Sequence, residues 1–284
     1  MRAKLRLYLP LIKSLQTGLL VSTGLAGYMS ARCPVFHLPA MTGLFISLFA
    51  SISGSTILNM WWDRDIDSCM SRTQGRPLVS GTVQPAQALR LGLVLSLLGV
   101  GLAFAMSPLY GAVIFAGWFF DVVVYTIWLK RRTCWSIVWG GLAGGMPILA
   151  GRALALQGLD WVGVVLALGV LFWIPTHILT FSMRHYQDYQ AARLPTFAST
   201  YGFRFTRFTI AISSLLAALA MGLGAWGIGM DWGFLRLMGV LSAGLLLLAI
   251  GVMFKPSERV NFGLFKYASV YMLAAMLLVV LEML

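Results

Sequence analysis

Apolar segments of about twenty residues recur along the whole chain, separated by short polar stretches. Each is long enough to cross a hydrocarbon core of about 30 Å, and each must be helical because lipid offers no partner to bare backbone groups. The segments lie near residues 10–31, 39–59, 86–107, 109–129, 136–157, 160–182, 206–230, 233–254 and 263–283. The pattern predicts an all-α, polytopic membrane protein of about nine transmembrane helices. We expect one membrane-embedded domain over residues 1–284, and the weakest division is Ser107-Pro108.

Composition supports this class of protein. Hydrophobic residues make up 59% of the chain and charged residues only 11%, whereas a soluble domain carries about a quarter charged residues.

Basic residues are distributed unevenly between the two sets of loops. Of the 21 Lys and Arg residues, only Arg32, Arg152 and Arg236 fall on the side opposite the N-terminus. Because basic residues accumulate on the cytoplasmic side, we expect a cytoplasmic N-terminus and an external C-terminus in a multi-pass protein of the cell membrane. Membrane topology therefore explains most of the net charge of +12, and no nucleic-acid partner is needed. The partner that we expect is membrane lipid.

Acidic residues are rare, and a third of the nine lie together at the end of the second segment. Asp63, Asp65 and Asp67 fall within five residues, although like charges repel and anions near lipid are costly. Something positive must therefore offset them.

The spacing within this cluster suggests a metal site. Asn59, Asp63 and Asp67 are four residues apart, so they share one face of a helix, and Asp65 points away. Three oxygen-bearing side chains suit a hard cation such as Mg²⁺, which typically bridges to a phosphate. Arg72 and Arg76 follow in the loop, and guanidinium groups bind phosphate in bidentate fashion. The cluster therefore predicts a diphosphate site; the alternative is a solvated helix end with ordinary ion pairs.

Two further polar groups fall on the same side of the membrane. His185 and Asp188, three residues apart at the end of the sixth segment, can face the same way and help to enclose a headgroup. Lys130 and Arg131 end the fourth segment. They are either topology determinants or ligands of a leaving diphosphate.

Two residues inside the segments are also candidates. Asp121 lies about two turns inside the fourth segment, where an acid is expensive and usually functional, although it could pair with a basic neighbour. His177 lies two residues after Pro175 and either lines a cavity or is a hydrogen-bonded core residue.

Together these residues resemble the UbiA superfamily of intramembrane prenyltransferases, whose signature is an Asn and two Asp at spacing four, ending the second of nine helices. Asn59, Asp63 and Asp67 match that signature, and the resemblance covers nearly the whole chain. Within the superfamily the chain looks most like the protoheme IX farnesyltransferase branch, through the stretches DRDIDSCMSRTQGRPLVSG, YTIWLKRRTCWSIVWGGLAGGMPILAG and FWIPTHILTFSMRHYQDYQAARLP.

The resemblance implies a fold, a reaction and roles for these residues. The fold would be a UbiA-type bundle, and the reaction would transfer farnesyl from farnesyl diphosphate to a vinyl group of heme B, giving heme O. Mg²⁺ would be held by Asn59, Asp63 and Asp67. The remaining roles are catalysis by Asp63, Asp67, Asp188 and Lys130, diphosphate binding by Arg72, Arg76, Lys130 and Arg131, and acceptor binding by His177, His185, Tyr125 and Asp121.

Other functions remain open at this point. A prenyltransferase of the same type could act on a quinone precursor, a lipid or a chlorophyll-like acceptor. A membrane transporter could also carry acids within its helices, but it would place them near the bilayer midplane in repeated halves. A heme-handling protein without catalysis could use His177 and His185, but it would leave the acid cluster unexplained.

Overall fold

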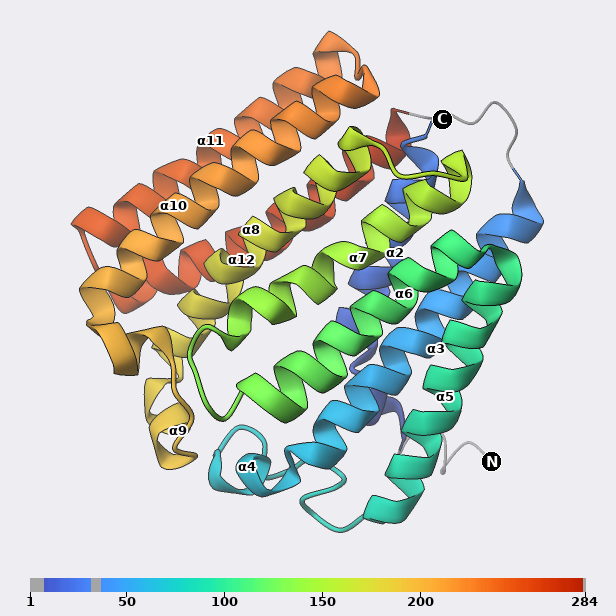
Figure 1. Cartoon of the computed structure of the whole chain (residues 1–284). Helices are drawn as coiled ribbons and strands as arrows, with labels where there is room; N and C mark the ends of the chain where they lie inside the picture. Colours follow the sequence, from blue (N-terminus) through green and yellow to red (C-terminus); the bar gives the residue numbers. More distant parts are fainter. Residues whose placement is uncertain (1–7, 32–36, 283–284) are drawn as a thin grey trace.

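The computed structural model describes residues 8–31 and 37–282, and every regular element within them is helical (Figure 1). Arg32 lies outside the described residues. The short elements are η1 (Leu9–Ile12), α4 (Arg64–Cys69) and α9 (Tyr186–Ala191). The long elements are α2 (Ser14–Met29), α3 (Leu38–Trp62), α5 (Pro85–Met106), α6 (Pro108–Phe119) continued by the π-helix η2 (Phe120–Leu129), α7 (Ser136–Leu156), α8 (Trp161–Arg184), α10 (Phe197–Ile228), α11 (Trp232–Phe254) and α12 (Glu258–Leu281).

Each expected apolar segment corresponds to one long helix. Eight of the helices in the described part are long and apolar enough to cross a membrane; α2 has 16 residues, and η1 precedes it in the same apolar segment. The expected break is present, because Ser107 adopts an extended backbone (φ −161°, ψ 134°) between α5 and α6. The seventh segment begins earlier than expected, at Phe197, but Gly202 interrupts α10 with a φ of 80°. The polar start of α10 before that kink conceals its first turns in the sequence.

The helices pack closely where small residues meet. α2 packs against α7, and a Cβ added to Gly151 would lie 1.9 Å from the carbonyl oxygen of Gly24. α3 packs against α5, and a Cβ on Gly99 would lie 2.3 Å from the amide nitrogen of Ser51. Small residues allow such close backbone approach, which drives helix association where lipid removes the hydrophobic contribution.

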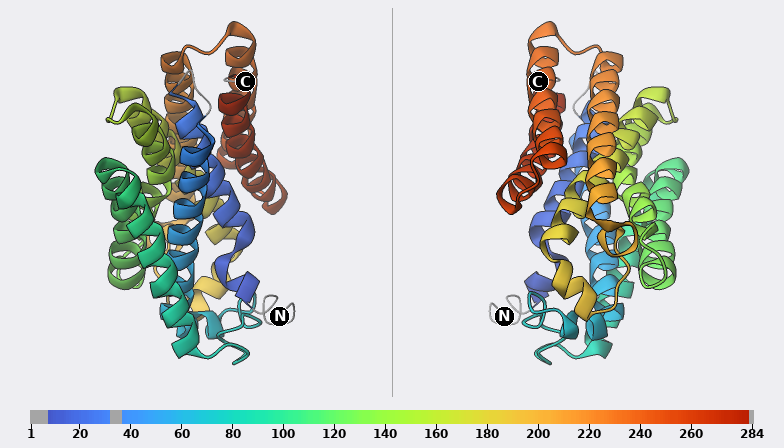
Figure 2. Two further views of the ribbon diagram at one scale, coloured as in Figure 1. Left: turned by 90° about the vertical axis from the view of Figure 1, so that its right-hand side faces the viewer. Right: turned by 90° about the vertical axis from the view of Figure 1, so that its left-hand side faces the viewer.

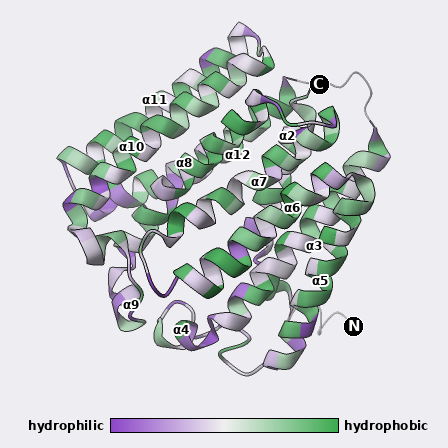
Figure 3. Ribbon diagram, in the orientation of Figure 1, coloured by the Kyte–Doolittle hydropathy of each residue, from purple (hydrophilic) through white to green (hydrophobic). Residues whose placement is uncertain are grey.

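The bundle has an apolar circumference and one polar end. Large side chains on the outer surface are strongly exposed, such as Leu97 at 73%, Trp226 at 66% and Leu247 at 70%, as expected for residues that face lipid. The views in Figure 2 place α4 and α9 at one end of the bundle and the α10–α11 turn at the other. Hydrophilic residues gather around α4 and α9 in Figure 3. This polar end contains the candidate site.

Candidate active site

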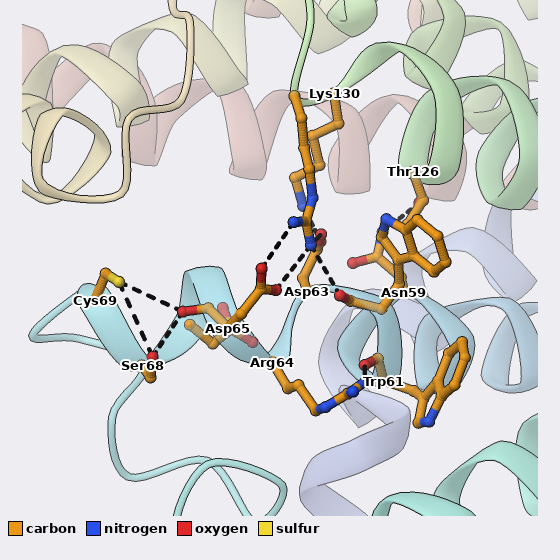
Figure 4. Close-up of polar contacts among 12 residues, drawn as sticks. Asn59, Trp61, Asp63, Arg64, Asp65, Ser68, Cys69, Thr126 and Lys130 are labelled. Carbon is orange, nitrogen blue, oxygen red and sulfur yellow. Dashed lines mark hydrogen bonds and ion pairs between the residues drawn. The ribbon is translucent and has the colours of Figure 1, made fainter.

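The row of Asn59, Asp63 and Asp67 crosses the junction between α3 and α4. Asp63 caps α3, and its N–H donates to the Asn59 carbonyl at 3.0 Å, while the Asp67 N–H donates to the Asp63 carbonyl at 2.8 Å. The helical i,i+4 relation therefore continues through the junction. The side chains of Asp63 and Asp67 are 2% and 8% exposed, but that of Asp65 is 62% exposed. Asp65 is thus much more exposed than the two acids of the row, although its carboxylate lies beside Asp63 (Figure 4).

Each of the three acids is paired with a basic residue. Lys130 donates to Asp63 Oδ2, and Arg76 Nη1 donates to Asp67 Oδ2. Arg131 forms a bidentate pair with Asp65 at 2.7 and 2.8 Å, and this hydrogen bonding lowers the pKa of the Asp65 carboxyl. The basic partners in these pairs supply the positive charge that the acid cluster requires.

One carboxylate oxygen of the row is buried without a hydrogen-bond donor. Within the described residues this atom is Asp63 Oδ1, and Arg131 Nη2 lies 3.8 Å from it. Leaving a buried carboxylate oxygen unsatisfied costs about 1–3 kcal/mol or more. No group of three His, Cys, Asp or Glu that could hold a metal occurs in the described part of the chain, so a cation here needs an amide oxygen, a phosphate or water as well. The donor set nevertheless fits a hard cation, because its free atoms are oxygens.

Thr126 fixes the orientation of the Asn59 amide. The Thr126 hydroxyl donates to the backbone carbonyl of Asp121 at 2.7 Å, because a carbonyl can only accept. The hydroxyl therefore accepts from Asn59 Nδ2 at 2.8 Å, which leaves Asn59 Oδ1 available to another ligand (Figure 4). Thr126 is fully buried. A lone Thr in an apolar segment has no sequence signal that would identify this role.

The π-helix η2 brings Thr126 and Lys130 to the site. Lys130 N–H donates to the Tyr125 carbonyl at 2.8 Å, which is an i→i−5 bond and not an α-helical one. Such wider turns are rare and frequently occur at functional sites. The Lys130 ammonium lies 5.5 Å from the Tyr125 ring centroid, so Tyr125 also borders the acid row.

The second polar group closes the site from the α8–α9 side. Asp188 Oδ1 accepts from the Ser71 backbone at 3.2 Å and from its hydroxyl at 2.8 Å, and Arg72 Nε lies 3.9 Å from Asp188 Oδ2. The loop after α4 is therefore tied to α9. His185 Nδ1 is 3.7 Å from Asp188, but partial burial lowers the pKa of His185, so this contact is weak at neutral pH.

Asp121 and His177 lie in different surroundings. The Asp121 carboxylate faces the Ser55 side chain, with Lys13 and Lys130 as the surrounding cations. His177 is stacked between Trp173 and Phe265, and its Nδ1 is 3.3 Å from Ser269 Oγ. His177 therefore belongs to the contact between α8 and α12 and not to the acid row.

The chain matches known proteins over most of its length. The model of the UbiA prenyltransferase family matches residues 20–280. A protoheme IX farnesyltransferase of Archaeoglobus fulgidus is 43% identical over 202 residues, covering 70% of each chain. A protein of the same name from Pyrobaculum arsenaticum is 40% identical over 242 residues, covering 83% of this chain and 85% of its own.

Solved structures confirm the fold. A digeranylgeranylglyceryl phosphate synthase superimposes with a TM-score of 0.81 at 17% identity, covering 99% of both chains. A UbiA homolog from Archaeoglobus fulgidus bound to GPP and Mg²⁺ superimposes with a TM-score of 0.69 at 15% identity, covering 96% of this chain and 99% of its own. The family model covers most of the chain and the fold agrees with the expected helical bundle, so the chain belongs to the UbiA prenyltransferase family.

Proposed function

We propose that the protein transfers the farnesyl group of farnesyl diphosphate to a vinyl group of heme B, giving heme O. The observation that carries this proposal is the buried Asp63–Asp67 row, opposed by cations at the polar end of an apolar bundle. Identities of 43% and 40% to proteins named protoheme IX farnesyltransferase support this donor and acceptor. Membership of a prenyltransferase family favours this function over that of a transporter or a non-catalytic heme carrier.

We assign the metal to Asn59 Oδ1, Asp63 and Asp67. When bound there, Mg²⁺ supplies positive charge that neutralises the diphosphate oxygens. A solved relative of the same fold bound to GPP and Mg²⁺ supports this assignment. Asp63 Oδ1, a buried carboxylate oxygen without a hydrogen-bond donor among the described residues, would gain a ligand from such a metal.

Four cations around the row are assigned to the diphosphate. Lys130 and Arg76 already touch the acids, and Arg72 and Arg131 flank them. As the C–O bond of the donor breaks, both electrons leave with the diphosphate, and fixed cations stabilise this developing charge. Asp188 contributes by holding Ser71 and, through it, the loop that carries Arg72.

The prenyl cation is then captured by the acceptor. The vinyl π electrons form the new C–C bond, and water adds to the remaining cation with loss of a proton, which gives the hydroxyl of heme O. Tyr125 borders the acid row, where its ring face suits a cation. Asp121, His177 and His185 are the remaining candidates for contact with the acceptor.

Purified protein in lipid nanodiscs, incubated with labelled farnesyl diphosphate and Mg²⁺, tests the proposal. Heme B should be the acceptor that gains label, and omission of Mg²⁺ should abolish the transfer. A quinone precursor, a polar lipid and a chlorophyll precursor provide competing acceptors. Labelling of one of these while heme B remains unlabelled would refute heme B as the acceptor. It would still support prenyl transfer as the reaction.

A further inference from the structure

A row of aromatic rings runs along the contact between α8 and α12. Trp173 and His177 have centroids 5.0 Å apart and lie within 20° of parallel, and His177 and Phe265 are 4.5 Å apart at 25°. Phe265 and Phe262 continue the row at 6.0 Å and 10°. All four rings are half-buried and similarly oriented, so a flat ligand could lie against them.

Two cations lie over the ring of Phe262, at the end of this row. The Arg184 guanidinium carbon lies 3.7 Å from the Phe262 centroid, and the Lys266 ammonium lies 4.5 Å from the same centroid. Both residues are exposed, and neither forms an ion pair with a carboxylate in the described part of the chain. Two unpaired cations beside one ring are suited to a ligand that carries two anionic groups.

The row also borders the site of the acids. The Phe181 ring connects the two. Its centroid lies 5.5 Å from that of Phe265 and 5.1 Å from the guanidinium carbon of Arg72. A ligand on the ring row would therefore lie near Arg72, one of the cations assigned to the donor diphosphate, as an acceptor must.

We propose that Arg184 and Lys266 bind the two carboxylates of a porphyrin acceptor that lies against the α8–α12 ring row. The inference rests on the proposed acceptor, because protoheme carries two propionates on one edge and vinyl groups on another part of its rim. The carboxylates then stay at the polar end of the bundle, where charge is least costly, and the macrocycle lies in the apolar part. The arrangement sets the orientation in which the ring enters.

Paired porphyrin ligands test the proposal in nanodiscs of zwitterionic lipid. Arg184→Gln and Lys266→Gln should each weaken binding of hemin by about tenfold, as expected for loss of a charged hydrogen bond. Neither variant should change the affinity for hemin dimethyl ester, which keeps the flat ring but has no free carboxylate. Arg207→Gln is the matched control, since Arg207 also lies over a ring, 6.0 Å from the Phe203 centroid, but outside the ring row.

Several outcomes would overturn the proposal. If the variants bind hemin and its dimethyl ester equally more weakly, the two side chains act through packing. If hemin binding is unchanged, the carboxylates bind elsewhere. In a second set of nanodiscs that contain phosphatidylglycerol, variants that lose this lipid but keep their hemin affinity would assign the two cations to lipid. In each case the wild type still binds and farnesylates heme, so the proposed function stands. A wild type that binds neither porphyrin would instead refute the proposed acceptor, and this inference with it.

Discussion

Single side chains in the acid row differ in what they can contribute to catalysis. Asp63→Ala and Asp67→Ala each remove a buried carboxylate, and we expect turnover to fall by a factor on the order of 100 or more. Asp65→Ala is the matched control, because the Asp65 side chain is 62% exposed and its partner Arg131 already lies 3.8 Å from Asp63. Turnover of farnesyl diphosphate with heme B measures all three. Equal losses would contradict the division of the acids between two faces.

Thr126 supports a second prediction at this scale. Thr126→Val keeps the shape of the side chain but removes the hydroxyl between Asn59 Nδ2 and the Asp121 carbonyl. We expect the Mg²⁺ concentration for half-maximal turnover to rise by about five- to tenfold, since one hydrogen bond contributes about 1 kcal/mol. Thr126→Ser should restore the wild-type value. Electron paramagnetic resonance of Mn²⁺ binding in the presence of diphosphate should show the same order of metal affinity among the three proteins. A Ser variant that binds the metal as weakly as the Val variant would refute the positioning role of Thr126.

The sequence could predict the residues of the site better than their partners. Spacing alone identifies Asn59, Asp63 and Asp67, because the periodicity of a helix is fixed. The pairing of Asp67 with Arg76 and of Asp63 with Lys130 depends on how a loop folds back and where a distant helix ends. No local pattern contains that information.

At the scale of elements, one buried arginine joins three helix ends. Arg152, near the end of α7, forms a bidentate pair with Asp160, the cap of α8, at 2.8 Å for both bonds. It also donates to the Ser30 carbonyl at the end of α2. Asp160 in turn accepts from the Gly163 N–H at 3.0 Å and so caps α8. The pair therefore holds α2, α7 and α8 in register at the end opposite the active site.

This pair gives a pH-dependent stability. The hydrogen bond from Arg152 lowers the pKa of Asp160 below the ordinary value of 3.8, so the pair stabilises the fold fully above that value. The contribution is lost as the pH falls through the lowered pKa. Asp160→Asn should lower the thermal midpoint at neutral pH, and the difference from wild type should shrink below about pH 4. Asp231→Asn is the control, because the Asp231 side chain makes no capping hydrogen bond to α11; equal effects of the two variants would argue against a role for the pair.

Element boundaries show where the sequence is informative. Apolar runs define most of the helices well because lipid demands uninterrupted helix. The π-helix η2 is different, since its residues are as apolar as those of an α-helix, and the partners of Thr126 and Lys130 lie far away in the sequence. The α8–α12 ring row was likewise hidden, because His177 and Phe265 are far apart in the sequence.

At the scale of the whole molecule, the expected nine crossings would place the two ends of the chain on opposite sides of the membrane. We expect a reporter fused after Leu284 to lie outside the cytoplasm and one inserted at Gly75, beside the active site, to lie inside. The basic residues around the loops on the active-site side support this orientation. Alkaline phosphatase and green fluorescent protein fusions at both positions measure it. Both reporters on one side would require an even number of crossings, with α2 as the first helix to re-examine.

The ion pairs of the acid row have a consequence for the order of events in a catalytic cycle. Lys130 and Arg76 each occupy one carboxylate oxygen of Asp63 and Asp67. A metal held by both oxygens of these acids would release the two cations, and a diphosphate is an anion suited to receive them. Each ligand would then increase the affinity for the other, and by linkage the effect would be reciprocal. Re-formation of the original ion pairs after the cleaved diphosphate leaves would weaken the binding of the metal and favour its release.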